Sequence, residues 1–139
     1  HHKHEWRPIF YMRAEYNWIN KLKKNNHQYY ILCANNKPID KFCARFYKKI
    51  GCNIKLNTNC ASTCELMVVG DLVIEVYLPY GLIESLENEF SKIKDINNIK
   101  PEELIEKIFE KKHEIQVIMK QDKNIAKQIR NFTLSNFKS

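Results

Sequence analysis

Glycine is scarce in this chain, with three in 139 residues. Loops that cradle phosphate groups need closely spaced glycines, so neither a P-loop nor a dinucleotide-binding fingerprint can be written on the sequence. No serine lies in a nucleophile elbow, and no two histidines have metalloprotease spacing. The sequence therefore predicts a protein that binds a partner and is not an enzyme.

Long apolar runs are also missing. The longest, Leu66 to Gly70, has the length of a strand, whereas a helix needs about 20 apolar residues to span a bilayer. The polar start, His1-His2-Lys3-His4, does not resemble a signal peptide. His1 and His2 resemble the remainder of an affinity tag, and we assign them no role. We expect a cytoplasmic protein with no membrane partner.

Five cysteines are present, an odd number at irregular spacing that does not describe a disulfide framework and favours a reducing compartment. Cys33 falls in a predicted strand and Cys43 on the apolar face of a predicted helix, so both are expected to be small buried residues. Cys60 and Cys64 lie four apart in a polar loop, with Cys52 nearby. These two thiols are candidates for a soft-metal site or a reversible redox pair. His4, His27 or His113 would then complete the metal shell; alternatively, the cysteines only flank a strand.

The net charge of +7 raises the alternative of a basic nucleic-acid-binding protein. However, the basic residues are spread over every segment and interspersed with acidic ones. The only tight basic run is Lys21, Lys23 and Lys24. Cations are favoured at a helix C-terminus, so this run indicates a solvated helix end.

Apolar spacing predicts alternating helices and strands. Tyr11, Ala14, Trp18 and Leu22 favour a helix over Phe10 to Lys24. The aromatics near this helix are expected to pack in the core or, alternatively, to form the wall of a small-molecule pocket; they are Trp6, Tyr11, Tyr16, Trp18, Tyr29 and Tyr30. A strand from Tyr29 to Cys33, a helix from Ile39 to Ile50 closed by Gly51, and a strand from Asn53 to Leu56 form a right-handed parallel β-α-β unit.

A hairpin follows, with arms Glu65 to Val69 and Leu72 to Leu78 around Gly70-Asp71. Further predicted elements are a helix over 82–93, a helix from Pro101, a strand over 114–120, and a last helix capped by Asp122. We expect a single α/β domain over residues 1–139: a mixed sheet of about five strands flanked by helices.

This order of elements, from Trp18 to Ile93, resembles one half of the phospholipase-D-like fold. That family carries H-x-K-x4-D on its hairpin, with the histidine as nucleophile. Here Asp71 matches the aspartate, but Cys64 and Leu66 stand at the other two positions, so phosphodiesterase chemistry does not carry over. Catalytically inactive relatives are the effector-binding domains of archaeal TrmB-like transcriptional regulators, and this chain is similar to them in organisation. The resemblance implies a sensor domain that reaches DNA through an attached domain.

One short segment supports an enzyme alternative. Residues 44–51, Ala-Arg-Phe-Tyr-Lys-Lys-Ile-Gly, resemble the A-x-x-F-Y-x-K-x-G segment of GCN5-type acetyltransferases, with one residue fewer between the alanine and the phenylalanine. An amphipathic helix with a glycine cap explains the same residues, and the pyrophosphate loop of that family has no counterpart upstream.

Ligands of open α/β sheets bind beyond the carboxyl ends of parallel strands. This rule selects Asn35 and Asn36 after the first strand, and Asn57 and Thr58 after the second. In the hairpin, Glu65, Glu75 and Tyr77 are candidates because a carboxylate on a central strand is costly unless it is paired or faces a ligand; an exposed sheet edge is the alternative. We expect a homodimeric regulatory domain in which a small effector, metal or oxidant changes the loop from Asn57 to Cys64. The identity of the effector stays open.

Overall fold

The computed structural model describes residues 1–60 and 63–138 and confirms the α/β class. Its helices are α1 (Arg7–Lys24), α2 (Pro38–Lys49), α3 (Tyr80–Lys92), α4 (Pro101–Leu104) and α5 (Lys123–Ser135), with a 3-10 turn η1 (Ile96–Asn98) and a π-helical turn η2 (Ile105–Phe109) that continues α4. Its strands are β1 (Tyr30–Leu32), β2 (Asn53–Lys55), β3 (Glu65–Val69), β4 (Leu72–Tyr77) and β5 (Gln116–Gln121). Among the helices of the described residues, none is long and apolar enough to cross a membrane.

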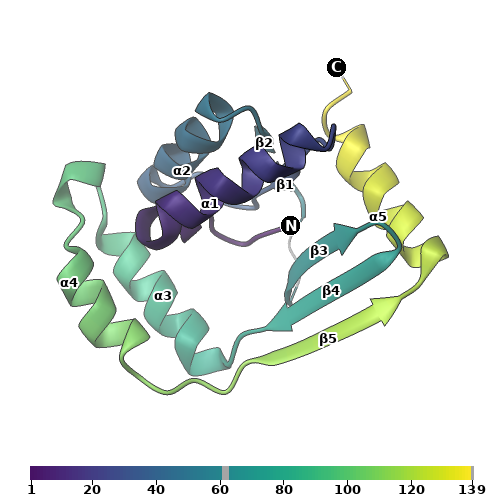
Figure 1. The fold of residues 1–139 in the computed structure, drawn as a ribbon. Helices are drawn as coiled ribbons and strands as arrows, with labels where there is room; N and C mark the ends of the chain where they lie inside the picture. The colour runs from purple at the N-terminus through teal and green to yellow at the C-terminus, as the bar shows by residue number, and fades with distance from the viewer. Residues whose placement is uncertain (61–62, 139) are drawn as a thin grey trace.

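The predicted single sheet of about five strands is wrong. The five strands of the described residues form two sheets, a parallel pair β1-β2 and an antiparallel sheet β3-β4-β5 (Figure 1). The N-terminal segment lies between them: the His2 N–H donates to the Leu32 carbonyl, and the His1 carbonyl accepts from the Leu66 N–H. The free edge of β1 is therefore occupied by His2, which bridges Cys33, and β3 does not pair with it.

The predicted β-α-β unit and hairpin are confirmed. Strands β1 and β2 are parallel, with Ile31 opposite Ile54, and β3 pairs antiparallel with β4. Gly51 ends the α2 region at φ +87°, a left-handed conformation that glycine adopts without strain. The segment that resembles an acetyltransferase is thus the end of α2 with its glycine cap. Cys33 and Cys43 are fully buried, as predicted.

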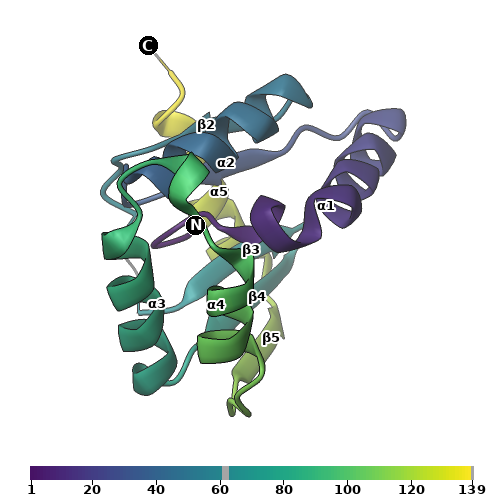
Figure 2. The same ribbon diagram turned by 90° about the vertical axis from the view of Figure 1, so that its left-hand side faces the viewer.

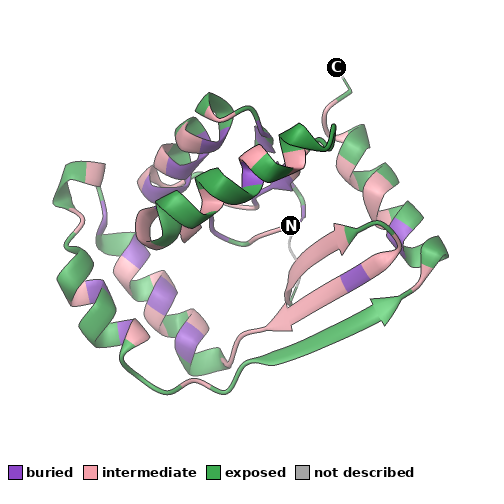
Figure 3. Cartoon of the chain, viewed as in Figure 1, coloured by how far each residue is buried: buried purple, intermediate pink, exposed green. Residues whose placement is uncertain are grey.

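The core has two parts (Figure 3). One lies between α1, α2 and the β1-β2 pair, and the other lies between α3 and the α4–η2 helix, which pack against each other (Figure 2). The first part contains Ile19, Ile31, Ala44, Tyr47, Cys52 and Ile54; the second contains Ile39, Leu82, Leu86, Phe90, Ile93, Leu104 and Ile108.

The predicted core face of the first helix is wrong. Tyr11, Tyr16 and Trp18 are about half exposed, at 53%, 50% and 44%, while Ile19 is buried. Non-helical backbone angles at Tyr11 (φ −125°, ψ 28°) join two helical pieces at a kink. After the kink, the inward face of the helix carries Glu15, Ile19 and Leu22, at i, i+4 and i+7, so Leu22 lies on it whereas Ala14 and Trp18 do not.

Candidate functional site

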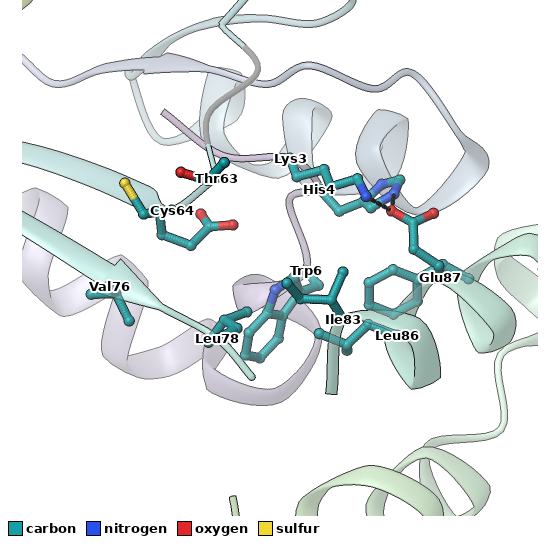
Figure 4. A pocket seen from close by; sticks show the side chains of 12 residues that line it. Lys3, His4, Trp6, Thr63, Cys64, Val76, Leu78, Ile83, Leu86 and Glu87 are labelled. Carbon is teal, nitrogen blue, oxygen red and sulfur yellow. Dashed lines mark hydrogen bonds and ion pairs between the residues drawn. The ribbon is translucent and has the colours of Figure 1, made fainter. Parts of the chain in front are cut away.

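A small cleft, open to solvent, lies between the N-terminal segment, the start of β3, the end of β4 and α3 (Figure 4). One part of its lining is apolar: Trp6, Val76, Leu78, Ile83, Leu86 and Phe90. The other part is polar: Lys3, His4, Thr63, Cys64, Glu65 and Glu87. An apolar wall with a few polar groups is the usual composition of a small-molecule site.

Local structure explains how α3 contributes to this cleft. Ile83, Leu86, Glu87 and Phe90 follow the spacing i, i+3, i+4 and i+7, which places them on one face of the helix. Phe90 is buried and its ring meets the His4 ring edge-on, at 5.5 Å between centroids. The helix therefore supplies both the apolar floor and one carboxylate.

Glu87 is the centre of an ion cluster at the cleft. Its carboxylate binds Lys3 at 2.8 Å, and it binds Lys37 and His4 at 3.1 Å each. Burial raises the pKa of Glu87, but the hydrogen bonds from the two lysines outweigh it and bring this pKa down to about 2. Glu87 is therefore ionised at neutral pH and fixes the positions of Lys3 and His4.

His4 connects this cluster to a fully buried carboxylate. Its Nδ1 lies 3.2 Å from both carboxylate oxygens of Asp40, and its Nε2 lies 3.1 Å from Glu87. Asp40 also accepts the backbone N–H groups of Glu5 and Lys37, each at 2.8 Å. The Lys37 bond caps the first turn of α2, so the position of the imidazole is tied to the end of a helix.

A second polar chain reaches Glu65. Arg7 donates to Nε2 of His2 at 3.1 Å, so the proton of this imidazole sits on Nδ1, which donates to the Glu65 carboxylate. Burial lowers the pKa of His2 well below its usual value and raises the pKa of Glu65. A neutral imidazole thus orients Glu65, the one predicted hairpin carboxylate that lines the cleft.

The loops after β1 and β2 do come together, as expected from the parallel pair. The Asn57 N–H donates to the Asn35 carbonyl, and the Asn35 side chain donates to the Lys3 carbonyl at 2.9 Å. Thr58 is buried and donates to the Cys33 carbonyl at 3.1 Å. Asn36, the next residue in the chain after Asn35, is exposed. These bonds hold the loops and the N-terminal segment together, and none of the four residues lines the cleft.

Glu75 and Tyr77 pair with each other on β4. The Tyr77 hydroxyl donates to Glu75 at 2.8 Å, and this bond raises the pKa of Tyr77 to about 12. The predicted need for a partner of Glu75 is met within the strand. Neither residue lines the cleft.

The two candidate thiols have different surroundings. Cys60 is buried, with its thiol donating to the His2 carbonyl at 3.8 Å, whereas Cys64 is half-buried in the lining of the cleft. Neither forms a disulfide. Residues 61 and 62 between them lie outside the described residues. In the part of the chain that the structure describes, no three His, Cys, Asp or Glu side chains are grouped so as to hold a metal ion.

We expect Cys64 to be the first cysteine that reacts with a water-soluble alkylating agent in the folded protein. Burial raises the pKa of Cys52 to about 11 and also raises those of Cys33 and Cys43, so these thiols are neutral and shielded. Native labelling with iodoacetamide followed by peptide mass spectrometry measures the order. Cys64→Ser should remove the fast phase, and a fast phase that survives in this variant would contradict the placement of the thiols.

Several lining residues were not among the sequence candidates: Lys3, Ile83, Leu86 and Glu87. His4 was considered only as a possible metal ligand, and in the structure it bonds to two carboxylates instead. The spacing of Ile83, Leu86 and Phe90 was visible, but it only marks a helix face. For Glu87, a carboxylate within that apolar stripe was the available signal.

No family model, no curated protein and no solved structure matches this chain.

Proposed function

We propose that this chain is a non-catalytic regulatory domain that binds a small, largely apolar molecule with one polar group in the cleft of Figure 4. The observation that carries the proposal is the divided lining. Trp6, Leu78 and Ile83 offer an apolar wall, and Thr63, Glu65 and Glu87 stand opposite as polar groups. Such a lining takes the body of a ligand on one side and orients its head group on the other.

The bonding of His4 supports binding over catalysis. A general base needs a nitrogen that can reach the substrate proton, whereas both nitrogens of His4 are bonded to carboxylates. This imidazole positions Glu87 and Asp40. His4 therefore has a structural role at the cleft.

The charge of the lining favours a ligand that donates hydrogen bonds. Glu65 and Glu87 contribute carboxylates, and Lys3 contributes the only lysine or arginine among the lining residues. Glu87 is already paired with Lys3 and Lys37. Glu65, whose partner His2 is neutral, is therefore the carboxylate that favours a neutral or cationic head group over a carboxylate head group.

The path of the chain provides a way to transmit binding. Lys3 and His4 line the cleft, and the same segment runs directly into α1 at Arg7. A ligand that holds this segment would also fix the start of α1 and the Thr63–Glu65 edge of β3. In this proposal α1 relays the change to an attached DNA-binding domain.

We further propose that the domain belongs to a homodimeric, archaeal regulator similar to the TrmB-like sensors, with a phospholipase-D-like ancestry. The order helix, β-α-β unit, hairpin and helix supports this reading. Cys64 in the lining adds a second input, because oxidation or binding of a soft metal at that thiol would change the same wall.

Three probes of matched shape test the ligand proposal: benzamidine, benzamide and benzoate, which share a ring and differ in charge. We expect calorimetric titration to detect benzamidine and benzamide binding more tightly than benzoate. Ile83→Trp should fill the apolar wall and weaken binding at least tenfold. Glu84→Trp is the matched control, since Glu84 is exposed on the same helix and outside the cleft. Equal weakening in both variants, or no binding of any probe, would refute the site.

A further inference from the structure

Among the described residues, no strand pairs with the outer edge of β5. It is the last strand in the order β3-β4-β5, and all six of its residues are exposed (Figures 1 and 3). Val117, Ile118 and Met119 are 53%, 51% and 67% exposed, and Ile115 just before the strand is 47% exposed. A regular apolar edge of this kind is a template for another strand, since its N–H and C=O groups have no partner in the sheet.

The register shows which backbone groups point outward. The Asp122 N–H donates to the Asp71 carbonyl, directly beyond the last printed pair of the ladder, Leu72 with Gln121. Backbone groups alternate in direction along a strand, and the ladder runs without a bulge from Gln116 to Gln121. Residues with even numbers therefore bond to β4, and those with odd numbers, such as Val117 and Met119, point to the free edge.

A second copy of this chain fits the edge. In a symmetric antiparallel pair, residues whose backbone groups point to the free edge of one strand must face such residues of the other strand. The two-fold axis therefore lies between the two copies of a single residue, which faces itself across the axis. With Val117 on the axis, Glu114 lies opposite Lys120 of the second copy. Moving the axis to Ile118 places Glu114 opposite Asp122, and moving it to Gln116 places Lys112 opposite Lys120. Both of these neighbouring registers oppose like charges.

We propose that two copies of this chain pair through β5, antiparallel, with Val117 opposite Val117. The same register sets Ile115 opposite Met119 and joins the two sheets into one of six strands. Val117 and Met119 lie on the face of Val76 and Ile74, their partners in β4, so the apolar surface continues across the seam.

The present contacts of the edge do not oppose this pairing. Lys120 binds Asp122 at 3.1 Å, but its side chain is 60% exposed, and exposed ion pairs contribute little to stability. Lys120 can therefore change its ion-pair partner from Asp122 to Glu114 of the second copy at little cost in free energy.

Sedimentation equilibrium on the whole chain tests the proposal, with a 16.7 kDa monomer as the reference. We expect a dimer at micromolar concentration. Val117→Pro should weaken it at least tenfold with an unchanged circular dichroism spectrum, because the lost N–H points away from β4. Ile118→Pro is the control for direction: its N–H bonds to β4, so this variant should lower the melting temperature. A monomer at 100 µM, or an undiminished dimer in Val117→Pro, would overturn the proposal.

Charge exchange tests the register. Glu114→Lys and Lys120→Glu should each weaken self-association, and an equimolar mixture of the two variants should restore it, because every facing pair is then opposite in sign. No rescue in the mixture would refute this register.

The pairing through β5 rests on the dimeric part of the proposed function and specifies its interface, but it does not depend on the cleft. Loss of probe binding with the dimer intact refutes the cleft alone, and a monomer that still binds the probes refutes the surface alone.

Discussion

Replacing Asp40 with alanine is expected to lower the free energy of unfolding by about 3–5 kcal/mol. The Asp40 carboxylate is fully buried, and its removal leaves the Glu5 and Lys37 N–H groups without their acceptor. It also removes one of the two carboxylates bonded to the buried His4. Buried donors that lose their partners carry their full desolvation cost, which adds to the lost cap of α2.

Urea denaturation followed by circular dichroism measures this loss. Asp122→Ala is the matched control, because Asp122 also caps a helix, accepting from Asn124 at 3.1 Å and Ile125 at 3.0 Å, but its side chain is 25% exposed. The control should lose less than half as much stability as Asp40→Ala. Equal losses would mean that Asp40 acts only as a helix cap, and the ion cluster around His4 would then not contribute to the fold.

Arg7→Met is expected to cost about 3–5 kcal/mol as well, because it leaves the buried carboxyl group of Glu5 without its cation. Glu5 is 1% exposed and accepts from Arg7 at 3.0 and 2.9 Å. Burial lowers the pKa of Arg7, but the adjacent Glu5 raises it by more, so the guanidinium stays charged. Arg7 also lies over the ring of Tyr47, at 5.9 Å from its centroid.

A double-mutant cycle with Glu5→Met separates the pair from its surroundings. The double variant should be more stable than Arg7→Met alone, since removing both charges removes the unpaired carboxylate. Lys92→Met provides a surface comparison: Lys92 binds Glu89 at 2.7 Å, but it is 63% exposed, so its loss should hardly move the midpoint. An Arg7 effect as small as that of Lys92 would contradict the burial of this ion pair.

The local structure of this chain was predictable from its sequence. Helical spacing from Ile39 to Ile50, the glycine that follows, the hairpin around Gly70 and the cap at Asp122 were each visible and are each observed. All of these features depend on residues close together in the chain. The same holds for the parallel order of β1 and β2, which a short crossover dictates.

The arrangement of these elements was not predictable in the same way. His1 and His2 are polar and resemble a tag, yet their backbone joins β1 to β3. Every residue except proline offers the same backbone donor and acceptor, so the sequence does not show which backbone groups pair, and the division into two sheets was not predictable from it. The kink at Tyr11 was likewise not predictable, because neither proline nor glycine occupies that position.

The candidate site was predicted in part. Glu65 and Cys64 line the cleft, whereas Asn35, Asn57 and Thr58 bond to the backbone of other loops or of β1. The rule for open parallel sheets selected the loops after β1 and β2, but this parallel sheet has only two strands and its edge is covered by the N-terminal segment. The cleft instead arises where α3 meets that segment.

Titration of ¹⁵N-labelled protein with benzamidine, followed in ¹H–¹⁵N correlation spectra, tests the cleft most directly. We predict saturable shifts of the backbone signals of Lys3, His4, Thr63 to Glu65 and Ile83 to Glu87. Shifts centred on Asn35, Asn57 and Thr58, or shifts that do not saturate, would contradict this account.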